Sequence, residues 1–192
     1  MHVIAIDDSI VVALADGAGG VANGARAAQS WIDVVAENPT RAAWRELVEE
    51  LDADSTRRGA GQTTAIAIEV TADGLSGVCV GDSAVWLITD TEVIDLAEHV
   101  PPKPLVGDGC MVYEVESCFD RGTLLVASDG LVKYASRGRI AEIARGESLE
   151  VATSALITLV RRHDGTLTDD TTVVLVRRPM KRAARWSEAT DY

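Results

Sequence analysis

Four aspartates in this sequence stand at the ends of apolar runs that are typical of buried strands. They are Asp16 after residues 11–15, Asp82 after 78–80, Asp129 after 124–127, and Asp169 before 173–176. A carboxylate at the end of a buried strand costs free energy unless it is paired or bound to a cation. Carboxylates at the ends of neighbouring strands also repel one another. The pattern therefore predicts cations between them.

The donor set indicates which cations these are. All-oxygen ligands without His or Cys suit a hard ion such as Mg²⁺ or Mn²⁺. Two such ions ~3.5–4 Å apart can lower the pKa of a shared water and stabilise an in-line displacement at phosphorus. A glycine follows Asp16 and Asp129 and precedes Asp82, so the backbone can come close to a bound ion. A single aspartate of this kind would only indicate a turn, but Asp16, Asp129 and Asp169 together favour a metal site.

The elements that must position these side chains follow from hydrophobic periodicity. Apolar residues at helical spacing predict helices over residues 22–36, 41–51, 139–144 and 149–162. Thr40 is a candidate N-cap for the second helix and Ser148 for the last. Alternating or continuous apolar runs predict strands over residues 2–6, 10–15, 64–70, 75–80, 84–89, 92–96, 111–116, 123–127 and 171–177.

The order of these elements predicts the fold class. Asp73-Gly74 is a strong hairpin signal, and successive strands with helices grouped early and late favour an α+β fold with antiparallel sheets. A length of 192 residues suits one domain. We predict one domain over residues 1–178 and a basic C-terminal tail over 179–192.

Composition excludes several classes of protein. A formal net charge of −12 argues against a nucleic-acid-binding protein. Since no apolar run reaches the roughly 18 residues that a membrane span needs and no secretory signal is visible, we expect no membrane partner. Three cysteines without a C-x-x-C pair favour a reducing, cytoplasmic compartment.

Five short motifs, in this order, resemble the signature of metal-dependent protein phosphatases of the 2C type. They are Ala15-Asp16-Gly17-Ala18-Gly19-Gly20, Gly61-Gln62-Thr63-Thr64, Val80-Gly81-Asp82-Ser83, Ala127-Ser128-Asp129-Gly130-Leu131 and Asp169-Asp170-Thr171-Thr172. Each motif alone is weakly specific, whereas all five in order over most of the chain are strongly specific. The chain thus resembles a compact, bacterial-like member with a shortened N-terminus.

The resemblance implies a fold, a site and an activity. The fold would be two packed antiparallel sheets flanked by helix pairs. Asp16 would bridge two metal ions, the Gly17 carbonyl would bind one of them, and Asp129 and Asp169 would complete the coordination shell of the second ion. Asp82, with Asp129, would match a third metal site of bacterial members. The implied reaction is hydrolysis of phosphoserine or phosphothreonine in a phosphoprotein by metal-activated water, with two or three Mn²⁺ or Mg²⁺ ions.

The chain also departs from the family pattern. Upstream of the Asp16 strand the family carries a phosphate-binding arginine and an acidic pair. This sequence has no arginine there, and Asp7 and Asp8 lie too close to Asp16 and are better interpreted as a hairpin turn. The segment between Gly130 and Ser148 leaves little room for the flap that many members have near the substrate. We therefore expect a phosphatase of impaired activity, without an identified catalytic residue outside the metal set. The alternative is a catalytically inactive, phosphatase-like binding module in a regulatory circuit.

Overall fold

The computed structural model describes residues 1–6, 8–18 and 22–177, and within these the strands form two larger antiparallel sheets and a short two-stranded ribbon. The first sheet has the order β1-β2-β5-β6-β9. Its strands are β1 (His2–Ile6), β2 (Ser9–Leu14), β5 (Ala65–Val70), β6 (Leu75–Val80) and β9 (Tyr113–Ser117). The second has the order β11-β10-β7-β8. Its strands are β7 (Ala84–Ile88), β8 (Val93–Asp95), β10 (Thr123–Ala127) and β11 (Val173–Arg177).

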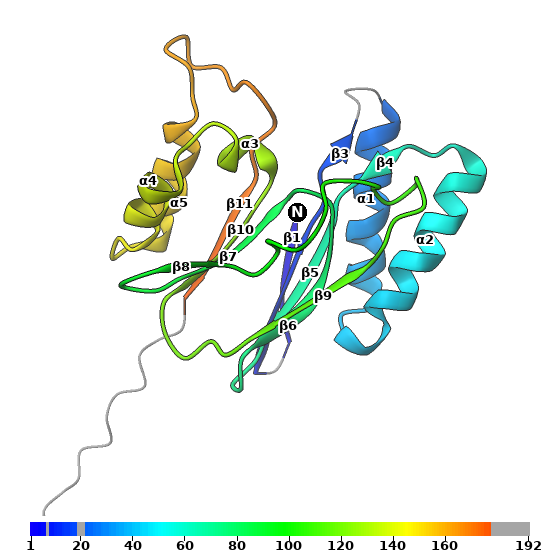
Figure 1. The fold of residues 1–192 in the computed structure, drawn as a ribbon, viewed down its shortest axis with the longest axis horizontal. Coiled ribbons are helices and arrows are strands. Elements are labelled where there is room, and N and C mark those ends of the chain that lie inside the picture. Colours follow the sequence, from blue (N-terminus) through cyan, green and yellow to red (C-terminus); the bar gives the residue numbers. More distant parts are fainter. Residues whose placement is uncertain (7, 19–21, 178–192) are drawn as a thin grey trace, which may run out of the picture.

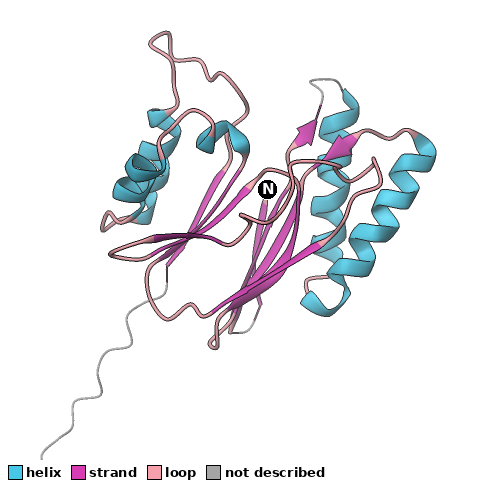
Figure 2. Cartoon of the chain, in the orientation of Figure 1, coloured by secondary structure: helices cyan, strands magenta, loops and turns pink. Residues whose placement is uncertain are grey.

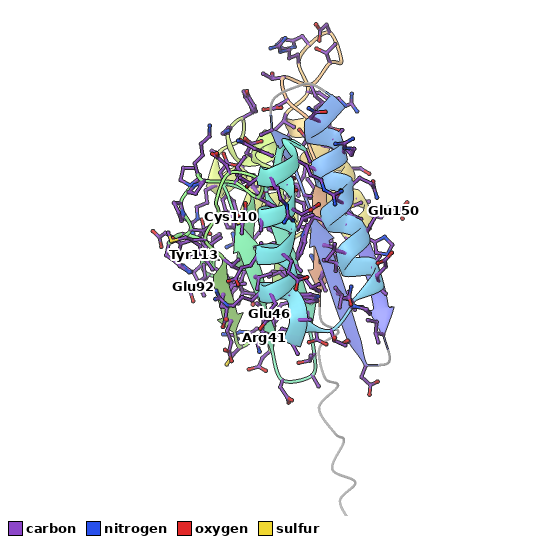
Figure 3. All side chains as sticks on the ribbon, turned by 90° about the vertical axis from the view of Figure 1, so that its right-hand side faces the viewer. Arg41, Glu46, Glu92, Cys110, Tyr113 and Glu150 are labelled. Atoms are coloured by element: carbon purple, nitrogen blue, oxygen red, sulfur yellow. The ribbon has the colours of Figure 1, made fainter. Side chains whose placement is uncertain are left out.

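Helices cover the outer face of each sheet (Figures 1 and 2). Over the first sheet lie α1 (Ala22–Glu37) and α2 (Trp44–Arg58), the latter preceded by the 3₁₀ turn η1 (Arg41–Ala43). Over the second lie α4 (Arg137–Ala144) and α5 (Leu149–Leu159). Figure 3 looks onto the α1/α2 layer, where Arg41 and Glu46 lie at the end at which α2 begins. The predicted α+β sandwich with flanking helix pairs is therefore confirmed.

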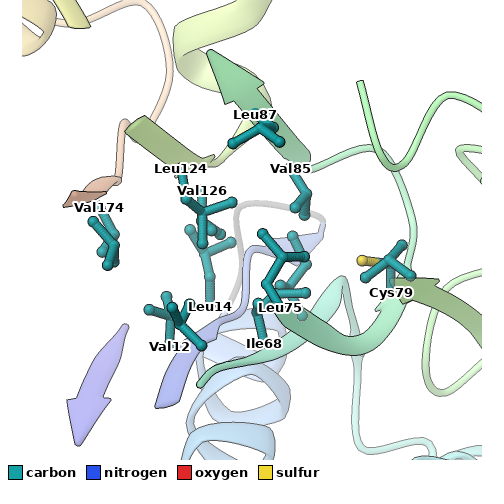
Figure 4. Close-up of a cluster of buried hydrophobic side chains, with 14 of the residues drawn as sticks. Val12, Leu14, Ile68, Leu75, Cys79, Val85, Leu87, Leu124, Val126 and Val174 are labelled. Atoms are coloured by element: carbon teal, nitrogen blue, oxygen red, sulfur yellow. The ribbon is translucent and has the colours of Figure 1, made fainter. Parts of the chain in front are cut away.

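Side chains alternate between the two faces of each sheet, and this alternation produces three buried interfaces. Val12 and Leu14 of β2 pack between the sheets against a cluster that includes Leu124 and Val126 of β10 (Figure 4). The intervening residues Val11 and Ala13 lie under the first helix pair, in a cluster with Trp31 and Trp44. A third cluster joins the second sheet to α4 and α5. Because successive side chains of a strand point to opposite faces, β2 supplies two of these interfaces at once.

Strand register places the ends that carry aspartates at one edge of the sandwich. In the second sheet Ala127 at the end of β10 pairs with Ala84 at the start of β7 and with Val173 at the start of β11. In the first, Leu14 pairs with Ile66, and Ala65 pairs with Val80 at the end of β6. The loops after β2, β6 and β10 and the loop before β11 therefore meet at the same edge. Those loops contain the four aspartates.

Several predicted boundaries differ from the structure. The predicted helix over residues 41–51 begins as a 3₁₀ turn and continues as α2 to Arg58. Its polar last turns hide the periodicity, but Asp54 pairs with Arg57 and Arg58, and Gly59 ends the helix at φ 60°. Thr40 is an N-cap without a side-chain hydrogen bond.

One cap was correctly predicted, and two further boundaries differ from the structure. The Ser148 hydroxyl caps α5 by accepting a hydrogen bond from the amide of Val151. The helix ends at Leu159 and not at 162, because Arg161 forms a bridge with Leu167. The last strand begins at Val173 and not at 171, since the amide of Thr172 is bonded to Ser128. The predicted tail over 179–192 lies outside the described residues.

Disulfides and membrane-spanning helices are both absent from the described part of the chain. All three cysteines are described and none forms a disulfide. Within the described residues, no helix has both the length and the apolar character that crossing a membrane requires.

Candidate active site

Asp16 is held in place by hydrogen bonds to its backbone amide and carbonyl. Its amide donates to Oγ1 of Thr64 at 2.9 Å, and its carbonyl accepts from the Thr64 amide at 2.9 Å and from Oγ1 of Thr63 at 3.0 Å. Thr64 is buried, and its hydroxyl also bonds Oγ of Ser83 at 3.0 Å. The two threonines and this serine, from the second and third motifs, therefore fix the position of the first.

Gly17 lies in β3 (Gly17–Ala18), which pairs with β4 (Gln62–Thr63), and packs against the beginning of α1. A Cβ on Gly17 would stand 2.3 Å from the backbone carbonyl group of Gly24. No side chain fits at that separation. The glycine therefore allows the helix and the Asp16 loop to approach each other.

Ser128 joins the loop of Asp129 to that of Asp169. Its buried hydroxyl accepts from the amide of Thr172 at 2.9 Å and donates to the carbonyl of Asp170 at 3.1 Å. The Asp169 carboxylate lies in an exposed loop and accepts from the amide of Asp170 at 3.0 Å. These bonds hold the two loops together at the end of the second sheet.

The four aspartates share one electrostatic environment. The pKa of Asp16 is raised to about 7, first by burial, then by the negative charge of Asp129 and a hydrogen bond with it, and then by the charges of Asp169 and Asp82. A carboxylate whose pKa is raised by neighbouring carboxylates lies where a cation would be stabilising. The structure thus brings Asp82, Asp129 and Asp169 within electrostatic reach of Asp16.

One cation already contacts two of them. Nζ of Lys133 lies 3.4 Å from Oδ2 of Asp82 and also contacts Oδ2 of Asp129. The hydrogen bond to Asp129 is the main cause that raises the pKa of Lys133. Among the described residues, no three Asp, Glu, His or Cys side chains are grouped so that they could hold one ion. The assignment of Asp16, Gly17, Asp82, Asp129 and Asp169 as metal ligands therefore stays a prediction.

A hollow of about 720 Å³ lies beside Asp16. Gly17, Gln29, Ser128 and Thr172 are among the residues that line it, and none of its described lining residues is Arg, Lys or His. The hollow has the room and the polar groups for a phosphorylated side chain. It offers no side-chain cation to balance the phosphate charge.

Solved structures with the same architecture are serine/threonine phosphatases of bacteria. The serine/threonine phosphatase of S. agalactiae aligns with a TM-score of 0.74 and 21% identity, over 87% of this chain and 86% of that one. The catalytic domain of the serine/threonine protein phosphatase PstP, in complex with two manganese ions, gives a TM-score of 0.67 and 22% identity, over 91% of this chain and 89% of that one. The chain has the fold of these phosphatases. The resemblance that the five motifs carry is thus confirmed at the level of the fold.

A further example of the phosphatase fold is MsPP of Mycobacterium smegmatis, in complex with cacodylate. It aligns with a TM-score of 0.69 and 22% identity, over 92% of this chain and 90% of that one. At such identities the likeness establishes the fold alone. No family model matches the sequence, and no curated protein matches it.

The residues of the site fit the hard cations that such a phosphatase fold implies. Every side chain in the cluster offers oxygen, the ligand that Mg²⁺ and Mn²⁺ prefer. The raised pKa of Asp16 marks an excess of negative charge. The Lys133 ammonium already lies against two of the carboxylates as a stand-in cation.

Sequence reasoning missed the residues that position this site. Lys133 follows Asp129 by four residues, a spacing that places two side chains on one face of a helix. That spacing was the available signal, but residues 129–132 were not predicted as the short helix α3 (Asp129–Val132). Thr63, Thr64 and Ser128 belonged to motifs, yet nothing in their spacing specified their hydrogen-bond partners.

Replacing Thr64 by Val should loosen the Asp16 loop. The substitution leaves the Asp16 amide and Ser83 without their shared partner, and we expect the free energy of unfolding to fall by about 1–3 kcal/mol. Mn²⁺ affinity should fall about 10- to 100-fold, as for other groups that orient ligands. Denaturant unfolding and calorimetric titration would measure the two effects.

Thr71→Val is the matched control for this variant, since Thr71 follows the other end of β5 and its Oγ1 accepts from the amide of Asp73. It should leave Mn²⁺ affinity unchanged. Equal loss of affinity in both variants would show that Thr64 has no special role at the site.

Proposed function

We propose that this chain is a metal-dependent phosphatase that hydrolyses phosphoserine or phosphothreonine in a phosphoprotein, and that it does so slowly. The observation that carries the proposal is the gathering of the loops of Asp16, Asp82, Asp129 and Asp169 at one edge of a phosphatase-like sandwich. There burial, and then the charges of the other three, raise the pKa of Asp16. The neighbours with this fold are serine/threonine phosphatases, and PstP holds two manganese ions. These facts support the substrate class and the metal requirement.

The roles of the residues follow from their positions. Asp16, the carbonyl of Gly17, Asp129 and Asp169 would hold two Mn²⁺ or Mg²⁺ ions. When bound, such ions lower the pKa of a water molecule and neutralise charge on a phosphoryl group. The hydrogen bonds of Thr63 and Thr64 hold the Asp16 backbone in place, and Ser128 ties the Asp129 loop to the Asp169 loop. The hollow beside Asp16 would receive the phosphorylated side chain.

Slow turnover follows from what the hollow does not provide. None of its described lining residues is a basic side chain that could neutralise phosphoryl oxygens as charge develops on them. Loss of one such electrostatic group costs on the order of 10² to 10³ in rate. The same observation favours a second candidate, a binding module that engages a phosphoprotein in a regulatory circuit without hydrolysing it. The free cysteines are compatible with a cytoplasmic location, which we propose for either function.

A Mn²⁺ titration of hydrolysis tests the proposal. We expect turnover of an aryl phosphate and of a phosphoserine or phosphothreonine peptide to rise with Mn²⁺ and to stop on chelation, below the roughly 1–10 s⁻¹ of an ordinary enzyme. An ordinary rate that saturates at micromolar metal would contradict impairment. Binding of the phosphopeptide without release of phosphate at any metal concentration would decide for the binding module.

A further inference from the structure

Lys133 brings a positive charge to two of the four aspartates. Its Nζ lies 3.4 Å from Oδ2 of Asp82 and contacts Oδ2 of Asp129. The Asp129 side chain is only 14% exposed, whereas that of Lys133 is 52% exposed. The ammonium therefore reaches in from solvent to a carboxylate that is mostly buried.

Two parts of the fold bring Lys133 into contact with Asp129 and Asp82. Lys133 ends the short helix that Asp129 begins, and its amide donates to the carbonyl of Asp129 at 2.9 Å. One helical turn therefore places the two side chains on the same face. Asp82 arrives from the connection between β6 and β7, at the end of β7 that pairs with the end of β10. An ammonium at this point bridges carboxylates that are 47 positions apart in the sequence.

We propose that the Lys133 ammonium is a built-in cation that occupies the place between Asp82 and Asp129 and excludes a divalent ion from it. A metal ion bound there would need oxygens of both carboxylates, and it would be repelled by the ammonium that now contacts them. The inference deepens the proposed function, since it concerns the same carboxylates. In this proposal Lys133 takes the place of the third metal ion that the sequence predicted. Asp16, Asp129 and Asp169 would then hold two metal ions.

Calorimetric titration with Mn²⁺ tests this directly. Lys133→Gln removes the charge and keeps most of the side-chain length. We expect this variant to bind one more ion than the unaltered chain, or to bind Mn²⁺ at the Asp82–Asp129 pair about tenfold more tightly. Adding Asp82→Asn to Lys133→Gln should remove the gained binding. Lys133→Arg, which retains the charge, should keep the stoichiometry of the unaltered chain.

Arg139→Gln serves as the control for the loss of a cation. Arg139 is a similarly exposed cation that pairs with Glu142 in α4. This control should bind Mn²⁺ as the unaltered chain does. Equal stoichiometry and Kd for the unaltered chain and Lys133→Gln would overturn the proposal, and so would an ion in the unaltered chain that Asp82→Asn alone removes.

The outcomes separate this inference from the proposed function. Gained binding in Lys133→Gln would support the built-in cation even if no variant hydrolysed a phosphopeptide. Manganese-dependent hydrolysis by the unaltered chain, with no gain of binding in Lys133→Gln, would support the phosphatase and overturn the role of Lys133.

Discussion

Asp16→Asn should reduce manganese-dependent hydrolysis by at least about 10²- to 10³-fold. The reason is that Asp16 is the carboxylate on which the charges of Asp129, Asp169 and Asp82 all act. In the proposed site Asp16 would coordinate both metal ions, so its loss should weaken the binding of both. The measurements are turnover of an aryl phosphate at saturating Mn²⁺ and the Kd for Mn²⁺ from calorimetry.

The same variant should stabilise the metal-free protein. A neutral amide at position 16 removes one of the repelling charges, so we expect a higher Tm in chelator near pH 8. Lower activity together with higher metal-free stability is the signature of a residue whose placement serves binding and not folding. A fall in metal-free Tm would instead assign Asp16 a structural role.

Asp90→Asn is the matched control for this substitution. Asp90 is exposed and lies in the turn between β7 and β8, at the opposite end of β7 from Ala84. Its replacement should change neither turnover nor Mn²⁺ affinity. If Asp90→Asn and Asp16→Asn had equal activity, Asp16 would have no place in the site.

Mn²⁺ should raise the Tm, and by more at pH 8 than at pH 5. At about one hundred times its Kd, a ligand that binds only the folded state stabilises it by about 2.7 kcal/mol. For a domain of this size that corresponds to about 5–10 °C in Tm. The shift should be smaller in Asp16→Asn, and calorimetric melting with and without chelator would measure it.

The pH dependence follows from the pKa of Asp16. Its pKa of about 7 in the folded state lies above the ordinary value of 3.8, so between these pH values the folded state holds more protons than the unfolded state. Stability of the metal-free protein therefore falls as pH rises from about 4 through 7. Mn²⁺ would bind the ionised carboxylate and so reverse this loss, and we therefore expect the larger shift at pH 8. An equal Mn²⁺ effect at both pH values, or none, would contradict the prediction.

Part of the site could be predicted because its signals are local. An acid at the end of a buried apolar run marks Asp16, Asp82, Asp129 and Asp169 without knowledge of their partners, and the first three also adjoin a glycine. The same local signals predicted most helices and strands, because the periodicity of apolar residues reflects which face of an element is buried. The hydroxyl cap of Ser148 is local too, since it depends on a residue only three positions away.

What only the tertiary structure decided depends on contacts between distant segments. The bonds from Thr64 to Asp16 and Ser83 span 48 and 19 positions, and those of Ser128 span more than 40. No local pattern specifies such partners. The contact of Lys133 with Asp82 likewise requires the register that aligns Ala84 with Ala127. The sequence by itself thus determined which side chains carry the charge, whereas packing of the two sheets determined which cation lies against them.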